Sequence, residues 1–219
     1  MGLRIEGLSA WYGQAHVLDG LTLTVPDGSI TGIVGYNGAG KSTLLRSVAR
    51  LHTSTSGIVE FDDVNLMKIG ASQVARLGVA LVREGAQVFD SLTVEEHIAL
   101  GQRLARHKPA ATAQVDNVFE TFPMLDRFRK ARAGLLSGGQ RQTLALATAF
   151  ASQPTMLLLD EPSTGLATRV ADQIYEILAM LSSRGITILV VEQNSMWLKR
   201  VADSRFLMQG GTLHPEVAI

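Results

Sequence analysis

The sequence predicts an α/β fold in which a mostly parallel sheet is joined by an N-terminal antiparallel β-subdomain and an inserted helical subdomain. Three continuous apolar runs, at 30–34, 156–160 and 186–191, are typical of parallel strands that are covered on both faces. Segments with a helical pattern lie between these runs, as they do in βαβ units. Alternating residues at 3–8 and 21–25 predict further strands.

The composition narrows the class of protein. The chain has 219 residues, of which 46% are hydrophobic, so it can bury a substantial core. Lys+Arg and Asp+Glu are both 20, and this balance argues against bulk electrostatic binding to nucleic acid. The absence of cysteine excludes disulfides and Cys-ligated metals. The sequence shows neither a secretory signal nor a membrane-spanning run, so we expect a cytoplasmic protein that docks on a membrane from outside if it serves one.

The first half of the chain alternates strands with loops. Turn residues at 26–28 precede the run at 30–34, which enters a glycine-rich loop. A helical pattern then covers residues 42 to about 51. The segment 57–63 predicts a strand that is antiparallel to the early ones, and a second strand–loop unit occupies 79–85.

A helical region follows. Thr93 and Glu96 form a capping-box pair ahead of apolar residues with helical spacing. Lys108 and Pro109 predict a break, and a second helix is expected over about 112–121.

The last part of the chain returns to α/β alternation. Helices are expected at about 140–151 and 168–183, with a buried strand between them. We therefore expect a single domain, in which residues 1–85 and 136–219 form the core with its β-subdomain and residues 86–135 form the helical subdomain.

The segment "GYNGAGKST", residues 35–43, carries the strongest local signal because it fits G-x-x-x-x-G-K-[ST]. Its backbone N–H groups would wrap phosphates, assisted by the positive end of the next helix. Lys41 would reach the β- and γ-phosphates, and the Ser42 hydroxyl would bind Mg²⁺. The expected phosphate-binding residues are Gly35, Asn37, Gly38, Ala39, Gly40, Lys41, Ser42 and Thr43.

The glycine-rich loop is open to two other interpretations. In a dinucleotide-binding fold, Glu60 would be the downstream acidic residue, but the glycine spacing here is G-x-x-G-x-G and such a loop does not need Lys-Ser at its end. A purely structural glycine loop is the other interpretation.

The segment "MLLLDEPST", residues 156–164, carries the second signal. Asp160 ends a buried strand, where P-loop enzymes place a carboxylate that holds Mg²⁺. Glu161 follows directly and could orient or deprotonate the attacking water. Taken alone, such a strand end is often only polar surface, and it is the pairing with the phosphate loop that favours catalysis.

Two further segments place polar residues beside helix starts and strand ends. In "LLSGGQRQ", residues 135–142, a Ser-Gly-Gly precedes a helix, which suits an anion but is also an ordinary N-cap. In "ITILVVEQNS", residues 186–195, Glu192, Gln193 and Asn194 follow the apolar run. Open α/β sheets bind ligands at this end of their strands.

The segments "GYNGAGKST", "LSGGQ" and "LLLDEP", in that order, resemble the ATP-binding cassette (ABC) ATPases over nearly the whole chain. The resemblance implies a P-loop NTPase core, ATP and Mg²⁺ as ligands, and hydrolysis of ATP. In that family two cassettes close head to tail, and the signature of one caps the γ-phosphate held by the other. Ser137, Gly138, Gly139 and Gln140 would therefore bind nucleotide in the site of a partner, which is either an identical or a related chain.

The same resemblance assigns roles to three further residues. Tyr12 would stack on adenine, although surface packing in the hairpin is the alternative. Glu84 replaces the usual Gln that senses Mg²⁺ and water, and would act at the metal and in catalysis. Gln193 replaces the usual His that contacts the γ-phosphate, although it could merely cap the strand end.

These replacements are similar to one ATPase subunit of branched-chain amino acid importers. Arg83 and Thr168 depart from the prolines usual in that subtype, which weakens the assignment of the substrate. The sequence thus predicts an ATPase subunit on the inner face of the membrane, working with permease subunits and, indirectly, a substrate-binding protein, and without nucleic acid. A hydrolysis-poor partner cassette is the main alternative, and a soluble cassette in DNA repair or translation is the other.

Overall fold

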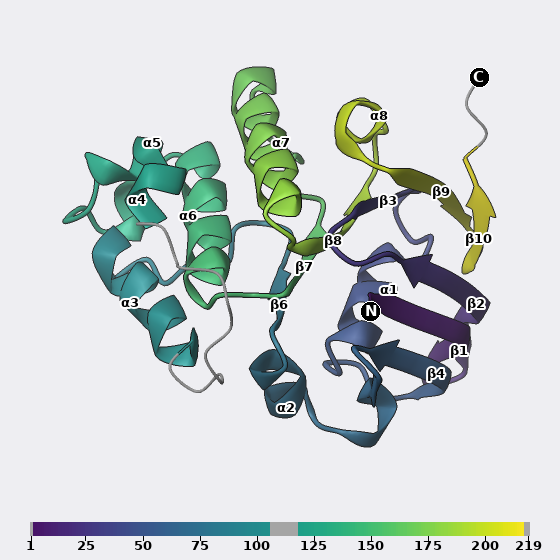
Figure 1. Cartoon of the computed structure of the whole chain (residues 1–219). Helices are drawn as coiled ribbons and strands as arrows, with labels where there is room; N and C mark the ends of the chain where they lie inside the picture. The colour runs from purple at the N-terminus through teal and green to yellow at the C-terminus, as the bar shows by residue number, and fades with distance from the viewer. Residues whose placement is uncertain (1, 106–117, 217–219) are drawn as a thin grey trace.

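The computed structural model describes residues 2–105 and 118–216, which form two sheets with helices around them (Figure 1). The larger sheet has the strand order β10-β9-β3-β8-β7-β6, and the smaller one has the order β2-β1-β4-β5. The strands are β1 (Leu3–Tyr12), β2 (Ala15–Val25), β3 (Ile30–Val34), β4 (Thr55–Phe61), β5 (Val64–Asn65), β6 (Val79–Val82), β7 (Met156–Asp160), β8 (Thr187–Glu192), β9 (Ser204–Gln209) and β10 (Thr212–Pro215).

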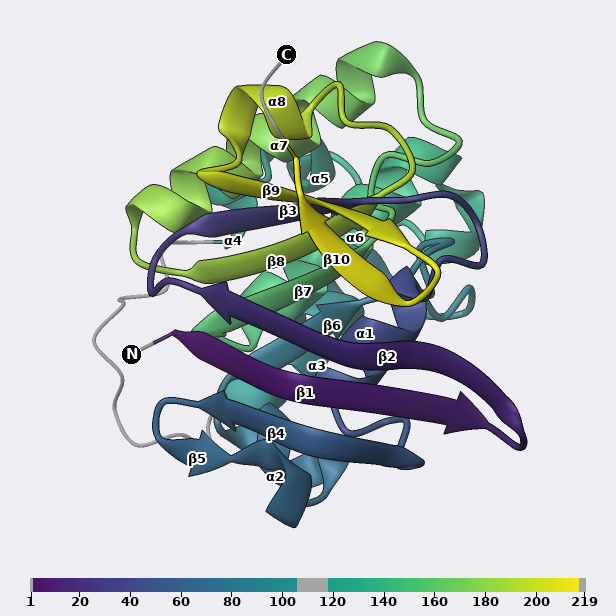
Figure 2. The same cartoon turned by 90° about the vertical axis from the view of Figure 1, so that its right-hand side faces the viewer.

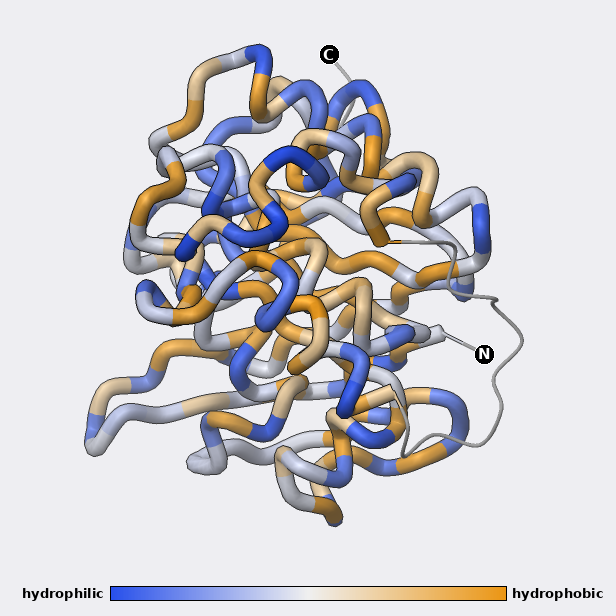
Figure 3. Tube along the Cα trace, turned by 90° about the vertical axis from the view of Figure 1, so that its left-hand side faces the viewer, coloured by the Kyte–Doolittle hydropathy of each residue, from blue (hydrophilic) through white to orange (hydrophobic). Residues whose placement is uncertain are grey.

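The larger sheet is parallel except at its β10 edge, where β10 pairs antiparallel with β9. Side chains of β7 alternate between two apolar layers. Leu157 and Leu159 face one layer, and Met156 and Leu158 face the other. Because both faces are covered, every residue of β7 and β8 is buried, which explains why these strands are apolar without alternation. Figure 3 shows such hydrophobic stretches (orange) running through the middle of the molecule.

Different elements supply the two layers. One layer is made by α6 (Gly138–Ala151), α7 (Thr168–Ser183) and α8 (Leu198–Val201). The other is made by α1 (Lys41–Val48) and the antiparallel sheet, whose strands β2, β1 and β4 lie side by side in Figure 2. Burial of one leucine in such a layer stabilises the fold by roughly 1.5–3 kcal/mol. The parallel sheet is thus fixed from both faces.

The helical region begins with α3 (Val94–Ala105), whose first turn is closed by the predicted capping box. The Thr93 N–H donates to Glu96 Oε2 at 2.7 Å, and the Glu96 N–H donates to Thr93 Oγ1 at 3.2 Å. Helix α3 packs closely on α6, because a Cβ at Gly101 would overlap the carbonyl oxygen of Thr148. The remaining helices are α2 (Ala71–Arg76), α4 (Val118–Thr121), α5 (Pro123–Asp126) and the 3₁₀ turns η1 (Leu66–Lys68) and η2 (Ala133–Leu135).

The predicted fold class is confirmed, with shifts at the boundaries. The strand predicted at 57–63 begins at Thr55 and ends at Phe61. The helix predicted to about residue 51 ends at Val48, because Arg50 takes a left-handed φ of 58°. Part of the helix predicted at 112–121, and the break at Lys108 and Pro109, lie outside the described residues. Strands β9 and β10 and helix α2 were not predicted.

Among the residues that the structure describes, no helix combines the length and the apolar character needed to cross a membrane.

Candidate functional site

Three of the four polar segments singled out in the sequence, all but 135–142, meet at the carboxyl ends of the parallel strands. The phosphate loop follows β3, Asp160 ends β7, and Gln193 follows β8, which lies between the other two strands. Because these strands are parallel, their carboxyl ends lie side by side. The order of the strands therefore assembles segments that are far apart in the sequence.

The phosphate loop is held in a conformation that needs glycine. Gly40 has a φ of 108°, and a Cβ there would lie 2.8 Å from Leu18 Cδ2. At the start of the loop, the Gly35 N–H donates to the carbonyl oxygen of Glu192 at 3.1 Å, which ties the loop to β8. Helix α1 begins at Lys41, so its N-terminus points into this loop.

Lys41 is buried and its ammonium group lies at the centre of the site. The Nζ donates to the carbonyl oxygens of Gly35 at 2.7 Å and Tyr36 at 3.1 Å. It also pairs with Glu161 Oε1 at 3.0 Å. A buried cation is stable only with such partners, and the same ammonium group could bind phosphate oxygens.

Ser42 and Asp160 come together as predicted for a Mg²⁺ site. The Ser42 hydroxyl donates to Asp160 Oδ1 at 3.0 Å. Burial raises the pKa of Asp160, the hydrogen bond from Ser42 opposes that rise, and the nearby Glu161 charge adds to it. A cation beside Asp160 would relieve this cost.

These two oxygens fit Mg²⁺. This ion usually takes one or two protein oxygens and completes its shell with water and substrate phosphates. No group of three or more His, Cys, Asp or Glu residues that could hold a metal occurs in the described part of the chain. Ser42 and Asp160 could supply the protein oxygens for such an ion.

Glu161 occupies an unusual backbone conformation with a φ of 47°. Its N–H donates to the Val191 carbonyl oxygen at 2.9 Å, and its Oε2 accepts a hydrogen bond from Thr164 Oγ1 at 2.9 Å. Strained backbone of this kind tends to cluster at functional sites. With Lys41 on its other oxygen, the Glu161 carboxylate is held in one position beside the phosphate loop.

The polar residues 192–194, at the end of β8 and directly after it, lie in two environments. Glu192 is 1% exposed and points into the protein, whereas Gln193 and Asn194 are exposed. Glu192 lies two positions after Val190 and so on the same face of β8, but both faces of this strand are buried, so alternation alone does not predict which polar residue turns inward. Only Gln193 and Asn194 stand at the strand mouth.

The signature segment, residues 135–142, forms a capped helix start. Ser137 is the N-cap of α6, and it exchanges hydrogen bonds with Gln140 at 2.8 Å and 3.3 Å. A Cβ at Gly139 would lie 2.8 Å from Val170 Cγ1, so α6 begins close against α7. Ser137 and Gly138 are exposed. Within the described residues, no hydrogen bond or ion pair joins residues 137–140 to the phosphate loop of the same chain.

Two predicted site residues, Tyr12 and Glu84, have exposed side chains. Tyr12 ends β1, is 46% exposed, and stacks on His52 with ring centroids 4.3 Å apart. Glu84 is exposed in the loop after β6, beside Arg83, which donates to Gln87 Oε1 at 2.9 Å. His52 was not singled out in the sequence, since no local motif marks it.

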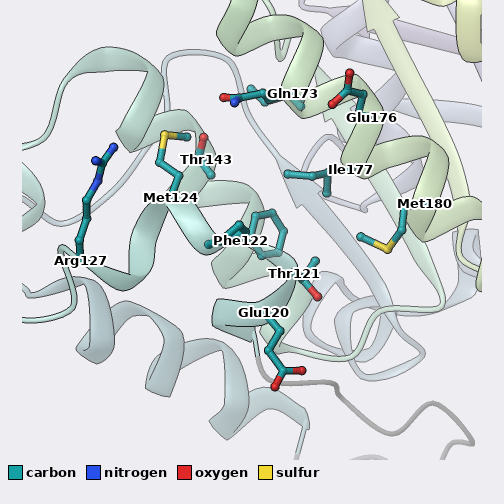
Figure 4. Close-up of a pocket in the computed structure, with 12 residues that line it drawn as sticks. Glu120, Thr121, Phe122, Met124, Arg127, Thr143, Gln173, Glu176, Ile177 and Met180 are labelled. Atoms are coloured by element: carbon teal, nitrogen blue, oxygen red, sulfur yellow. The ribbon is translucent and has the colours of Figure 1, made fainter.

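A cavity of about 680 Å³ lies elsewhere, between α4, α5 and α6 on one side and α7 on the other (Figure 4). Its walls are mainly apolar, with Phe122, Ile177 and Met180 among them. None of the residues that line it belongs to the phosphate loop or to the ends of β7 and β8. It is therefore separate from the phosphate chemistry.

A phosphate loop at the mouth of a parallel sheet, with Ser42 and Asp160 together and Glu161 beside Lys41, defines a P-loop nucleoside triphosphatase. Residues 18–164 match the model of the ABC transporter family. The chain belongs to this family and is one of its ATP-binding, ATP-hydrolysing subunits.

Individual relatives agree with the family. The chain is 38% identical to the high-affinity branched-chain amino acid transport ATP-binding protein BraG of Pseudomonas aeruginosa, over 96% of this chain and 90% of that protein. It is 36% identical to the probable branched-chain amino acid transport ATP-binding protein LivF of Archaeoglobus fulgidus, over 95% and 89%. A solved nucleotide-free ATP-binding cassette from an ABC transporter is 25% identical with a TM-score of 0.82, over 97% and 89%. Proteins named for phosphonate and phosphate import also match.

Proposed function

We propose that this chain hydrolyses ATP to drive a membrane importer of branched-chain or other hydrophobic amino acids. The observation that carries the hydrolytic part is the paired geometry of Ser42 with Asp160 and Lys41 with Glu161 at one sheet edge. The two branched-chain amino acid relatives support the class of substrate.

ATP binding would use groups on three elements. Backbone N–H groups of the phosphate loop and the N-terminus of α1 receive the phosphates, and Lys41 Nζ binds the β- and γ-phosphate oxygens. Tyr12 stacks on adenine with the ring face opposite His52. Ser42 and Asp160 would supply the protein oxygens for Mg²⁺, and Glu84 would act as the sensor of the metal and water. Bound there, the ion would neutralise phosphate charge.

The hydrolytic step would begin with a change of partner at Lys41. When Lys41 turns to a phosphate oxygen, Glu161 loses its ion pair and can accept a proton from the attacking water. Thr164 keeps hold of the other Glu161 oxygen during this change. Gln193 donates an N–H to a γ-phosphate oxygen, and so fixes the group that is transferred.

We also propose that the site is completed by a second cassette, of the same or a related chain, packed head to tail. The capped and exposed start of α6 supports this assembly, since it is suited to an anion and, among the residues that the structure describes, is not hydrogen-bonded to its own phosphate loop. The closing of the two cassettes would act on permease subunits at the inner face of the membrane. A substrate-binding protein would deliver the amino acid.

The transported substrate can be tested by uptake in cells that lack this chain. We expect native protein, but not Glu161→Gln, to restore ATP-dependent uptake of labelled leucine and isoleucine. Labelled phosphate and glutamate serve as controls, and their uptake should not change. Restored phosphate or glutamate uptake without leucine uptake would contradict the proposed substrate. It would not contradict the proposal that the chain hydrolyses ATP.

A further inference from the structure

Glu192 is a buried acidic residue with no part in the steps described so far. Its side chain comes from the last position of β8 and turns toward α7. The Oε1 atom accepts a hydrogen bond from the Ser163 N–H at 3.0 Å and another from the Tyr175 hydroxyl at 2.7 Å. Two donors from different elements thus converge on one buried oxygen.

Two backbone carbonyl groups, those of Glu192 and Val191, also form hydrogen bonds with residues of the phosphate site. Its carbonyl oxygen accepts the hydrogen bond from Gly35 that opens the phosphate loop. The preceding carbonyl oxygen, that of Val191, accepts the hydrogen bond from the Glu161 N–H at 2.9 Å. The next residue is Gln193. Glu192 therefore contacts both the phosphate loop and α7. It is also next in sequence to Val191, which binds the Glu161 N–H, and to Gln193, the proposed contact of the γ-phosphate.

The turn that Glu192 holds is the one that carries Glu161. Ser163 lies two residues after Glu161, and Thr164, which binds Glu161 Oε2, is the next residue. The turn begins with the strained Glu161 backbone, with its φ of 47°. Strained backbone persists only where its surroundings hold it in place. The Glu192 carboxylate is the side-chain group that anchors Ser163.

A buried carboxylate such as that of Glu192 is costly to the fold unless hydrogen-bond donors hold it. Burial raises its pKa, the bonds from Ser163 and Tyr175 oppose that rise, and the charge of Glu161 adds to it. Well-packed apolar side chains often stabilise a fold as well as buried charges do. Tyr175 is itself fixed, because its ring stacks on Trp197 with an interplanar angle of 4°.

We propose that Glu192 is a positioning residue for ATP hydrolysis, which holds the Glu161–Thr164 turn against β8 and so fixes the base relative to Gln193. The proposal rests on the proposed function, since Glu192 acts through Glu161. Its carboxylate is buried against Ser163 and Tyr175, so we expect it to act on ATP only through Glu161. Its loss should therefore slow the hydrolytic step and leave nucleotide binding as it is.

The test compares turnover, ATP affinity and melting temperature in three variants of the full chain. Glu192→Gln keeps the size and one acceptor oxygen but removes the charge, and we expect turnover to fall about tenfold. Tyr175→Phe removes one of the two hydrogen bonds to the Glu192 carboxylate and leaves the one from Ser163, and we expect a fall of about three- to tenfold. In both, the Kd for ATP should stay within about twofold of native. In Glu192→Gln, Tm should stay the same or rise, because a buried charge is gone.

Thr31→Val is the matched control. Thr31 is buried near the opposite end of β3 and shares a hydrogen bond of 3.0 Å with Ser204, so the variant also loses one buried hydroxyl bond. Its Tm should fall while its turnover stays native.

Three results would overturn the proposal. Turnover of Glu192→Gln within twofold of native would do so. So would a loss of turnover accompanied by weaker ATP binding and a lower Tm, which is the pattern of a purely structural role. If Glu192→Gln does not fold, native turnover in Tyr175→Phe would overturn it. If Glu161→Gln keeps its activity, the assignment of Glu161 as the base is wrong. If Glu161→Gln is inactive and Glu192→Gln turns over like the native chain, only the positioning role of Glu192 is wrong.

Discussion

At the scale of single residues, the site is built from charges that are buried and paired. Lys41 and Glu161 neutralise each other at 3.0 Å, and Asp160 has a hydroxyl partner in Ser42. Removing one member of a buried pair leaves an uncompensated charge, which is usually strongly destabilising. Substitutions that keep size and remove charge are therefore the informative ones.

Asp160→Asn should separate catalysis from stability. Burial disfavours the charge of Asp160 and raises its pKa, so the amide should keep or raise the melting temperature without nucleotide. Mg²⁺-dependent ATP hydrolysis should be lost, because the amide is a poorer ligand for a hard cation. Calorimetry and a phosphate-release assay measure the two effects. A lower melting temperature together with retained activity would contradict the assignment of Asp160 as a metal ligand.

Gln193 provides a second prediction, which concerns pH. Its amide cannot ionise near neutral pH, whereas a histidine with an unperturbed pKa near 6.5 can. Gln193→Ala should cut turnover about 10- to 100-fold, with less effect on ATP affinity, because it removes a hydrogen bond to a charged group.

Gln193→His should keep much of the activity and add a pH dependence between about 6 and 7. Turnover-versus-pH profiles of the native chain and both variants test this. Native turnover in Gln193→Ala would mean that the side chain only caps the strand.

At the scale of elements, close packing between α3 and α6 fixes the helical region on the core. A Cβ at Gly101 would overlap the Thr148 carbonyl oxygen and lie 2.8 Å from Ala151 Cβ. Overpacking of this kind costs about 1–3 kcal/mol, which exceeds the roughly 0.5–1 kcal/mol that alanine gains over glycine in a helix. Gly101→Ala should therefore lower the free energy of unfolding, as measured by denaturant titration.

A control for that substitution lies at the start of α2. The nearest atom to a Cβ at Gly70 is Gln73 Oε1 at 3.9 Å, so Gly70→Ala meets no backbone. Its unfolding free energy should change by less than about 1 kcal/mol. Equal losses in the two variants would show that the close contact at Gly101 is unimportant.

The elements also show what local sequence can predict. Helix α7 was predicted with its observed bounds, Thr168–Ser183, because its apolar residues repeat with helical spacing. Strand β9 was missed because its apolar run has only three residues, 206–208, and polar residues such as Arg205 flank it. Its pairing with β3 joins residues distant in the sequence. The direction of Glu192 depends in the same way on a partner, Tyr175, from another element.

At the scale of the whole molecule, two half-sites lie on one chain without contacting each other by hydrogen bonds in the described residues. The phosphate loop belongs to the core, and Ser137 begins α6, which packs with α3. Sequence motifs locate the phosphate loop and the 135–142 segment on the chain. They do not show that the described residues of these two segments form no hydrogen bond with each other in the fold. This separation supports an assembly of two cassettes.

Assembly can be measured by sedimentation. ATP and Mg²⁺ should promote association of Glu161→Gln, with an identical or a related chain, because binding is retained while hydrolysis is slowed. Adding Ser137→Arg should block association, since Ser137 is exposed and a long side chain there would occupy the contact. Association that is the same with and without nucleotide would contradict the head-to-tail arrangement.

The most direct test of the central claim, that this chain hydrolyses ATP with Glu161 as the base, is steady-state phosphate release by native protein and Glu161→Gln. General-base catalysis contributes roughly 10²- to 10⁴-fold, so we expect turnover to fall by about that factor. ATP binding, measured by equilibrium titration on the same samples, should be retained. Turnover of Glu161→Gln within twofold of native would contradict the claim and place the base elsewhere.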